Sequence, residues 1–475
     1  MTANTATTGV EVLTGNFTTL TDIYVSGVTN GVVLAQAPSV VFNKFKASNS
    51  VTTAIGMTTS STTQSISITG SNIYARTGFS YVNSASLSAI TISNSVFQSQ
   101  VVGSRGVFIS VSQADGFNLA INNCSFTDYS VLTGTSYSGA AVYVSASASM
   151  QANITVVSTT FTNNRGQNGP SLYAFGLNEV FLSELTVFNS ISSTSGGGFY
   201  LGSNFDVKIL DSEFKNCSAT GSGTSSGSGG AVYFNAANVN VLVANSTFSN
   251  NSATVSYGGA IYFPYSATGL LTIENCVLNE NYAGQTGGAI ASYGAFFMKN
   301  STVSSNSALS YGAGIYYANS QGTTISYILY SNFDHNSASN GGAIYSSSGY
   351  ITLDNATFTY NSASSLGGAI YAAYTTFSLY EATFQENSAS GASGGGMYIT
   401  SYSSLNVVAS GFIQNSASNS GGGFYCNSNA GVLLNNVVFN GNTASSGSAY
   451  VCSACLVTTT SVYVNPDNTV SCVSQ

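Results

Sequence analysis

The feature of this sequence that most constrains its fold is a repeat of about 28 residues. From the middle of the chain onward, segments such as SSNSALSYGAGIYY, DHNSASNGGAIYSS and TYNSASSLGGAIYA follow one another. Two landmarks recur in them, an F-x-x-N step and a G-G-A-I-Y step. Weaker matches to the first landmark near the N-terminus extend the repeat to about 16 units. The first landmark can be followed through Phe126, Phe161, Phe188, Phe214, Phe248, Leu278, Val303, Phe333, Phe358, Phe384, Phe412 and Phe439.

Each repeat contains short stretches in which apolar and polar residues alternate, such as residues 271–273 and 351–353, separated by Gly, Ser and Asn. This pattern is typical of β-strands, and no window sustains the apolar spacing of a helix. A unit this short cannot bury its own apolar face, so neighbouring units must stack. The sequence therefore predicts an all-β fold with essentially no α-helix, a right-handed parallel β-helix (a β-solenoid) of about 16 rungs.

The predicted β-helix occupies residues 1–450 as a single domain, with the most regular repeats over 126–450. Residues 451–475 hold three of the last four cysteines, and we expect them to form a C-terminal cap or the start of a Cys-rich module.

The second landmark predicts an outer ladder of tyrosines. The residue before each Tyr is apolar and is expected to point inward, so strand alternation turns the Tyr outward. We call this set the Tyr ladder. It comprises Tyr143, Tyr173, Tyr200, Tyr233, Tyr262, Tyr316, Tyr345, Tyr371, Tyr398, Tyr425 and Tyr450.

The asparagines of the first landmark predict a second ladder. Stacked at the strand spacing, each amide can donate to the next while its own backbone adopts the αL conformation. We interpret this Asn ladder as a structural bend rather than a binding site. Its members are Asn164, Asn251, Asn281, Asn306, Asn336, Asn361, Asn387, Asn415 and Asn442.

The chain is unusually poor in charge. Charged residues make up 5% of it, the formal net charge is −8, and no Lys or Arg follows Lys299. Such a chain lacks the clustered basic footprint that nucleic acid requires. No apolar run is long enough for a transmembrane segment. In a stack of rungs, an outward charge repeated in register would face its own copy, which accounts for the neutral surface.

The F-x-x-N and G-G-A-I steps, from about Phe97 to Tyr450, resemble the repeats of the chlamydial polymorphic outer-membrane proteins and, more broadly, the pectin-lyase-like β-helix superfamily. The resemblance implies a surface-displayed β-helix used in adhesion. The tail VCSACL…SCVSQ instead looks like the start of the Cys-rich modules of some protist surface proteins. Residues 1–13 show no signal peptide, and we expect a mature segment or a fragment of a longer surface protein.

The sequence contains few candidate catalytic residues. The single histidine, His335, occupies a variable position beside Asn336, where a solvated turn residue is expected. The densest acidic cluster, Asp206, Asp211 and Glu213, alternates with Lys208 and Lys215, which favours a solvated salt-bridged patch. We therefore expect no catalytic residue, no metal site and no cofactor, and no enzymatic activity as a polysaccharide lyase or hydrolase.

The cysteines and the glycosylation motifs indicate an oxidising, extracellular or cell-surface location. The motif Cys452-Ser-Ala-Cys455 is a weak zinc or redox signal, and we prefer disulfides among Cys426, Cys452, Cys455 and Cys472, with Cys426–Cys452 as the first choice. Candidate N-glycosylation sites are Asn16, Asn123, Asn153, Asn216, Asn245, Asn250, Asn300 and Asn355.

The favoured function is structural: an extracellular fibre subunit or adhesin that associates with itself, head to tail, or with surface glycans and proteins. The alternative is a carbohydrate-binding or polysaccharide-degrading β-helix whose Tyr ladder stacks on sugar rings. Ice binding is a weaker third option, because it needs Thr at fixed positions where this repeat mixes Ser, Ala and Gly.

Overall fold

The computed structural model describes the chain except for residues 1–7, 13–17, 35–37, 49, 58–64, 83–87, 112–115, 132–137, 148–150, 203–205, 222–226, 236–238, 265–268, 320–323 and 473–475. The described residues form strands and turns, and none of them lies in an α-helix. The chain divides into two compact units, Met1–Val239 and Asn240–Gln475.

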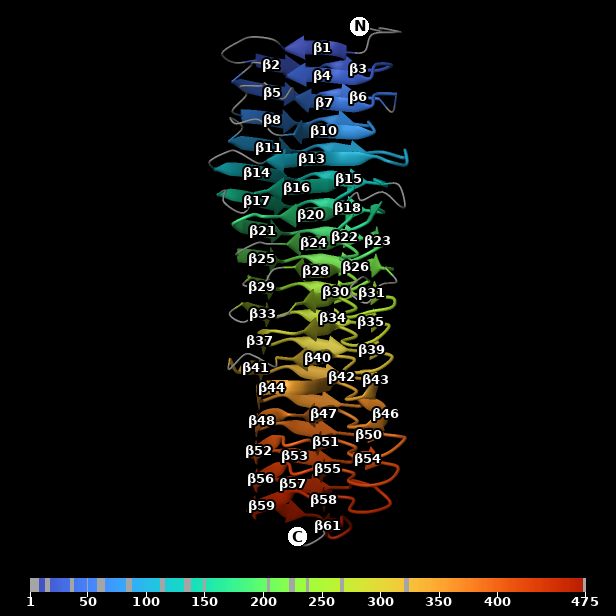
Figure 1. Cartoon of the computed structure of the whole chain (residues 1–475), viewed down its shortest axis with the longest axis vertical. Coiled ribbons are helices and arrows are strands. Elements are labelled where there is room, and N and C mark those ends of the chain that lie inside the picture. The colour runs from blue at the N-terminus through green and yellow to red at the C-terminus, as the bar shows by residue number, and fades with distance from the viewer. Residues whose placement is uncertain are drawn as a thin grey trace. The chain divides into compact units, whose positions relative to one another are not determined.

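In the first unit, each rung contributes one strand to each of three parallel sheets, which we call sheets A, B and C. One rung consists of β13 (Arg105–Val111), β14 (Phe117–Asn122) and β15 (Ser125–Thr127). These strands pair in parallel with β16 (Val142–Ala146), β17 (Ala152–Val157) and β18 (Thr160–Thr162) of the next rung. A fourth, short sheet D begins at β19 (Arg165–Gly166), which pairs with β23 (Ile191–Ser192). Figure 1 shows this stacking of strands.

The second unit repeats the same arrangement. Its rungs include β40 (Ile315–Ala318), β41 (Ser326–Leu329), β42 (Asn332–Asp334) and β43 (Ser337–Asn340) of sheets A to D. The next strand, β44 (Ile344–Asp354), serves both sheet A and sheet B, since it pairs with β47 (Ile370–Ala373) and β48 (Thr375–Tyr380). The predicted all-β parallel β-helix is confirmed.

Residues after position 450 continue the β-helix of the second unit. Strand β58 (Tyr450–Ser453) pairs with β55 (Phe424–Asn427), and β61 (Val470–Cys472) pairs in turn with β58. Strand β59 (Leu456–Thr460) pairs with β56 (Gly431–Asn435) in sheet B.

The phenylalanines of the first landmark form the inner row of sheet C. In the second unit the rings of Phe333, Phe358, Phe384, Phe412 and Phe439 stack with centroids 4.8–5.1 Å apart, and each is fully buried. Each buried aromatic ring stabilises the core both through its apolar area and through the stacked contact. The landmark therefore marks the core.

One landmark position was assigned to the wrong residue. Phe188 pairs with Thr162 on the outer face and is 37% exposed, whereas Val187 pairs with the buried Phe161. The sequence TVFN offers two apolar residues in a row, and strand alternation selects the first.

Each turn between two sheets has one residue in the αL conformation, at an equivalent position on successive rungs. Between sheets B and C, Asn300 and Asn355 have φ of 48° and 52°. Between sheets C and D, His335 and Tyr360 have φ of 54° and 53°. The prediction that the ladder asparagines themselves adopt αL is wrong, because the residue before each of them turns the chain and lets the Asn point inward.

Candidate functional site

The Asn ladder lies inside the second unit and is fully hydrogen-bonded. At a typical step, the Oδ1 of Asn361 accepts both the backbone N–H of Asn336, at 3.0 Å, and its side-chain Nδ2, at 2.9 Å. The Nδ2 of Asn361 donates to the Oδ1 of Asn387 at 3.0 Å and to the carbonyl of Phe333 at 2.9 Å. The same pattern links Asn251, Asn281, Asn306, Asn336, Asn361, Asn387, Asn415 and Asn442. These side chains are buried, so they cannot meet an external ligand.

The ladder has one member that the repeat did not reveal. Asn468 accepts from the backbone N–H of Asn442 at 3.3 Å and donates back to its carbonyl at 2.8 Å. In the first unit Asn164 is buried and makes the same backbone bonds, accepting from the N–H of Tyr129 and donating to the carbonyl of Phe126 at 3.2 Å. Its Nδ2 differs in donating to the hydroxyl of Ser171 instead of to another Asn. The asparagine row therefore belongs mainly to the second unit.

A ladder of serines at the turn between sheets B and C was missed in the sequence. The Oγ of Ser301 donates to the carbonyl of Lys299 at 2.8 Å and accepts the backbone N–H of Cys276 at 3.1 Å. Ser331 repeats both bonds one rung later, to Leu329 and from Ser301. A Ser or Cys directly after the αL residue, as in N-S-T and N-C-S, is the signal that could have revealed it.

The Tyr ladder lies on the outer face of sheet A. In the first unit, Tyr143, Tyr173, Tyr200 and Tyr233 stack at centroid distances of 5.0–5.1 Å. In the second unit, Tyr316, Tyr345, Tyr371, Tyr398 and Tyr425 stack at 4.7–5.7 Å. The ring faces therefore cover one another, and they are not free platforms for sugar rings.

Two positions depart from the predicted Tyr ladder. Tyr262 is opposite Ala291 in the next rung, and Tyr293 fills the gap with its ring 5.8 Å from that of Tyr262. Tyr450 was predicted to point outward, and this is wrong: it pairs with the inward Phe424 and is 8% exposed. In the last repeat Tyr450 directly follows the small residue Ala449, so the Tyr takes the inward place that Phe424 occupies one rung earlier.

Stacking and burial affect the ionisation of the ladder phenols. Burial, with a smaller contribution from Tyr257, raises the pKa of Tyr262 to about 12. Burial and neighbouring tyrosines also raise the pKa values of Tyr173 and Tyr345. An unfolded tyrosine titrates near 10.

Alkaline pH is therefore expected to unfold the chain through these tyrosines. Because their folded pKa values lie above the unfolded value, their stabilisation is complete below about pH 10 and is lost as the pH rises toward about 12. Tyrosinate absorbance should show a class of tyrosines that stays neutral at about pH 11 and ionises together with the loss of β-sheet circular dichroism. A single titration with a midpoint near 10 in the folded chain would contradict this.

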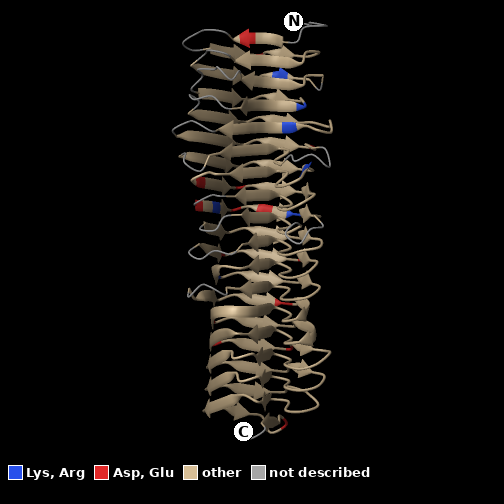
Figure 2. Cartoon of the chain, in the orientation of Figure 1, with Lys and Arg blue, Asp and Glu red and all other residues tan. Residues whose placement is uncertain are grey.

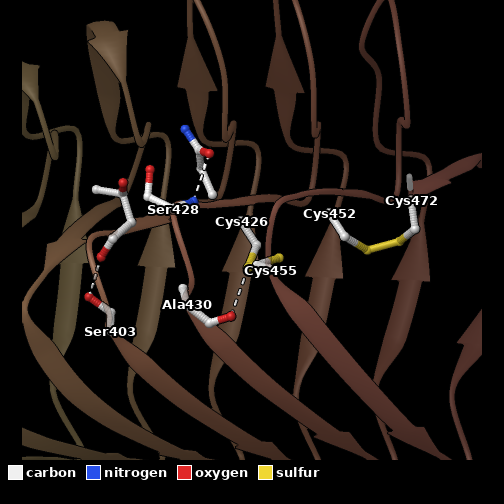
Figure 3. Close-up of a disulfide and its surroundings, with 9 residues drawn as sticks. Ser403, Cys426, Ser428, Ala430, Cys452, Cys455 and Cys472 are labelled. Carbon is white, nitrogen blue, oxygen red and sulfur yellow. Dashed lines mark hydrogen bonds between the residues drawn. A yellow bond between two sulfur atoms is a disulfide. The ribbon is translucent and has the colours of Figure 1, made fainter. Parts of the chain in front are cut away.

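The disulfides differ from the predicted pairing. Cys426, Cys452 and Cys472 occupy one register position on β55, β58 and β61, and stacking alone allowed Cys426–Cys452. Instead, Cys426 pairs with Cys455, with Cα atoms 6.1 Å apart, and Cys452 pairs with Cys472, at 4.4 Å (Figure 3). The two cysteines of the C-x-x-C motif thus belong to different disulfides, so the motif presents no dithiol for zinc or redox chemistry.

Peptide mapping without reduction is expected to recover the pairs Cys426–Cys455 and Cys452–Cys472. Replacing Cys426 and Cys455 together by Ser should destabilise the last rungs by about 2–4 kcal/mol, because the 29-residue loop loses its crosslink. Recovery of a Cys426–Cys452 peptide from the native chain would show that the pairing is wrong.

The remaining cysteines, Cys124, Cys217 and Cys276, are buried thiols. Burial raises the pKa of Cys124 and Cys276 to about 11 and that of Cys217 to about 12. The thiolate form is therefore suppressed, and these residues act as small core side chains.

The glycosylation candidates lie at different kinds of site. Asn123, Asn245 and Asn300 are exposed αL residues at the turn between sheets B and C, and Asn355 is half-buried there. Asn216 and Asn250 occupy the αL position between sheets C and D, and Asn153 lies in strand β17. Asn16 lies outside the described residues. The exposed αL turn is the position at which an attached sugar would project from the surface.

The isolated charged residues lie on outer faces. His335 contacts Asp334 at 2.7 Å and stacks on Tyr360 with centroids 4.9 Å apart, and its side chain is 59% exposed. Lys208 pairs with Asp206 at 3.8 Å and with Glu179 at 3.5 Å. Figure 2 shows that Lys, Arg, Asp and Glu residues are few and scattered. Across the described ranges, no group of three His, Cys, Asp or Glu side chains is arranged to hold a metal ion.

Comparison with known families agrees with this architecture. Residues 81–268 match the family model described as the right-handed beta helix region, and residues 330–347 and 355–373 match the Chlamydia polymorphic membrane protein repeat. No curated protein and no solved structure matches the chain. In the part of the chain that the structure describes, no helix has the length and apolar character needed to cross a membrane. By fold and by these matches, the chain is similar to right-handed β-helix proteins and carries repeats of the chlamydial polymorphic membrane protein type.

Proposed function

We propose that this chain is a surface-exposed structural β-helix that acts as an adhesin through its outer faces. The observation that carries the proposal is the match of residues 330–347 and 355–373 to a repeat named for a polymorphic membrane protein. In those residues the Phe and Asn of the first landmark are buried, so the outer positions are free to vary. The two disulfides fit an oxidising, extracellular compartment.

Labelling of intact cells tests surface exposure. An antibody raised against the purified chain should stain unpermeabilised cells that produce the protein, and protease treatment of the intact cells should remove the signal. Staining that appears only after permeabilisation would overturn the proposal. The adhesive role predicts, in addition, that the purified chain coated on beads retains them on a cell layer, whereas reduced and unfolded chain does not.

A non-enzymatic role is part of the same proposal. His335 is exposed and is engaged by Asp334 and Tyr360, and the acidic residues near Lys208 are spread along outer strands. Neither arrangement provides a buried acid–base pair of the kind that glycosidic bond cleavage uses. A reproducible cleavage of any polysaccharide by the purified chain, lost on replacement of one of these residues, would contradict it.

Self-association into fibres is a second candidate, favoured by the edge of sheet B at β59. Within the described residues this strand pairs on one side only, with β56, and its Leu456 is 71% exposed. An unpaired strand edge is a template for another chain, and repeated head-to-tail contacts give open filaments. Negative-stain microscopy of the purified chain should show filaments of variable length; only discrete particles at every concentration would remove this candidate.

Attached glycans are expected if the chain is secreted by a eukaryotic cell. The exposed turn residues Asn123, Asn245 and Asn300 are the sites we propose. Intact mass before and after enzymatic removal of N-glycans tests this, and an unchanged mass would exclude it.

A further inference from the structure

The outer face of sheet C in the first unit is hollowed near its N-terminal end. The hollow has a volume of about 370 Å³ and lies over β3 (Tyr24–Val25), β6 (Lys46–Ala47) and β9 (Asn72–Ile73). It is lined by Tyr24, Lys46, Ala47, Ser48, Asn72 and Tyr74. We call it the N-terminal hollow. Its volume falls in the range of about 300–1,000 Å³ that is usual for small-molecule sites.

Parallel strand pairing places the polar groups of this hollow in a row. Tyr24 is in register with Lys46, and Lys46 is in register with Asn72. Tyr74 follows two residues after Asn72, on the same outer face. The two tyrosines thus lie two rungs apart, about 10 Å along the stack. Lys46 lies on the strand between them, and Asn72 lies on the same rung as Tyr74.

The tyrosines of the hollow differ from those of the Tyr ladder. Tyr24 is 59% exposed and Tyr74 is 38% exposed, and neither stacks on another ring among the described residues. In the ladder, by contrast, adjacent rings such as those of Tyr143 and Tyr173 cover each other at 5.0 Å. The rings of the hollow are therefore open to the apolar face of a ligand, such as the C–H face of a sugar ring.

Two polar side chains of the hollow, those of Lys46 and Asn72, are unengaged among the described residues, whereas the hydroxyl of Ser48 bonds to that of Ser50 at 2.7 Å. Lys46 forms no ion pair and Asn72 no side-chain hydrogen bond within the described part of the chain. None of the described residues that line the hollow is acidic. Exposed cations in this chain are few, since Lys and Arg together number 8, and this one lines the same hollow as Tyr24 and Tyr74. A ligand that complements the hollow carries a carboxylate that pairs with Lys46 and hydroxyl groups that hydrogen-bond to Asn72. Its sugar rings stack on the two tyrosines.

We propose that the N-terminal hollow binds an acidic, carboxylate-bearing oligosaccharide, with Tyr24 and Tyr74 as stacking platforms and Lys46 as the anion contact. This inference deepens the proposed adhesive function by naming a ligand class. Binding is tested on the purified chain, so a failure to bind the oligosaccharide would not change the result of the surface-labelling experiment. Failure of the surface labelling would likewise not change the binding result.

The test is isothermal titration calorimetry at low ionic strength, with two oligosaccharides of equal length. A hyaluronan tetrasaccharide carries carboxylates, and the tetramer of N-acetylglucosamine is its neutral counterpart. We expect the acidic tetramer to bind with a Kd of about 1 mM or tighter, and the neutral one roughly tenfold more weakly. Absence of binding by the acidic tetramer, or equal binding of the two, would overturn the proposal.

Substitutions in the hollow test whether the tetrasaccharides bind there. Lys46→Gln should remove the preference for the acidic tetramer, and Tyr74→Ala should weaken both tetramers by roughly tenfold. Lys44→Gln is the matched charge control, because Lys44 is exposed two residues away and does not line the hollow. Tyr402→Ala is the matched ring control, since Tyr402 is 71% exposed in the second unit. If Lys44→Gln reduces binding as much as Lys46→Gln, the attraction is a general effect of charge and the site is wrong.

Each variant changes an exposed side chain, so circular dichroism should be identical to that of the parent chain. A variant that loses the β-sheet signal is replaced by a second one, Tyr24→Ser or Asn72→Ala, which carries the same expectation of weakened binding. Retained binding in both of these variants would also overturn the assignment.

Discussion

Replacing Asn361 by Ala is expected to lower the free energy of unfolding of the second unit by about 3 kcal/mol. The change removes the acceptor of the Asn336 backbone N–H and both donations from Nδ2, to Asn387 and to the Phe333 carbonyl. Asn361 is 1% exposed, so water cannot replace these bonds without opening the rung. A buried donor left without a partner costs about 1–3 kcal/mol. Urea unfolding followed by circular dichroism measures the loss.

The matched control is Asn355→Gly, six residues earlier on the chain. Asn355 is also an asparagine of the repeat, but it has a φ of 52°, and among the described residues its side chain bonds only to Asp354. Glycine adopts that conformation freely, so we expect a change within about 0.5 kcal/mol. Equal losses in the two variants would mean that the internal amide bonds contribute nothing specific.

Replacing Gly367 by Ala is expected to destabilise the second unit by about 3 kcal/mol or to prevent its folding. Gly367 begins the G-G-A-I-Y landmark with a φ of 67°, and an added Cβ would overlap the carbonyl oxygen of Ile370. The αL conformation alone costs a residue with a Cβ about 1–2 kcal/mol. The turns between sheets B and C tolerate Asn at similar φ, so the overlap with Ile370 is what makes this position strict.

Gly431→Ala serves as the control for that variant. Gly431 starts β56 on the outer face, and an added Cβ there meets nothing within 4 Å. Its substitution should change stability by less than about 0.5 kcal/mol. Thermal unfolding of both variants, scanned together, compares them directly; a Gly367→Ala midpoint equal to that of Gly431→Ala would contradict the steric account.

The fold and its two main ladders could be predicted because the repeat places the same residue at the same height on every rung. Phe358, Asn361 and Tyr371 each recur in neighbouring repeats, and parallel stacking turns such recurrence into contact. Strand alternation then separates inward from outward positions. The repeat predicts these contacts and side-chain directions only where it is regular.

Where one residue decides the register, the repeat pattern does not predict which side chain points inward. Val187 and Phe188 are both apolar, and Tyr450 directly follows the small residue Ala449 with no larger apolar residue between them, so the pattern alone assigned the wrong side chain to the core. The αL residue was misplaced by one position for a similar reason, since a sequence does not show which of two adjacent polar residues carries the turn.

The disulfide pairing and the N-terminal hollow depend on geometry that no repeat encodes. Stacking made Cys452 a neighbour of both Cys426 and Cys472, and the position of Cys455 at the next corner decided between them. Tyr24 and Tyr74 lie in the least regular repeats, where no landmark drew attention to them.

Hydrogen exchange of the folded chain, resolved to single residues by mass spectrometry, tests most directly whether the first landmark is an internal ladder of amides. We predict that the backbone amides of Asn281, Asn306, Asn336 and Asn361 are among the slowest to exchange, because each donates to a buried side-chain oxygen. In Asn361→Ala, the loss of protection should centre on Asn336. Exchange of these amides in the native chain as fast as that of the edge strand β59 would contradict the ladder and the fold built on it.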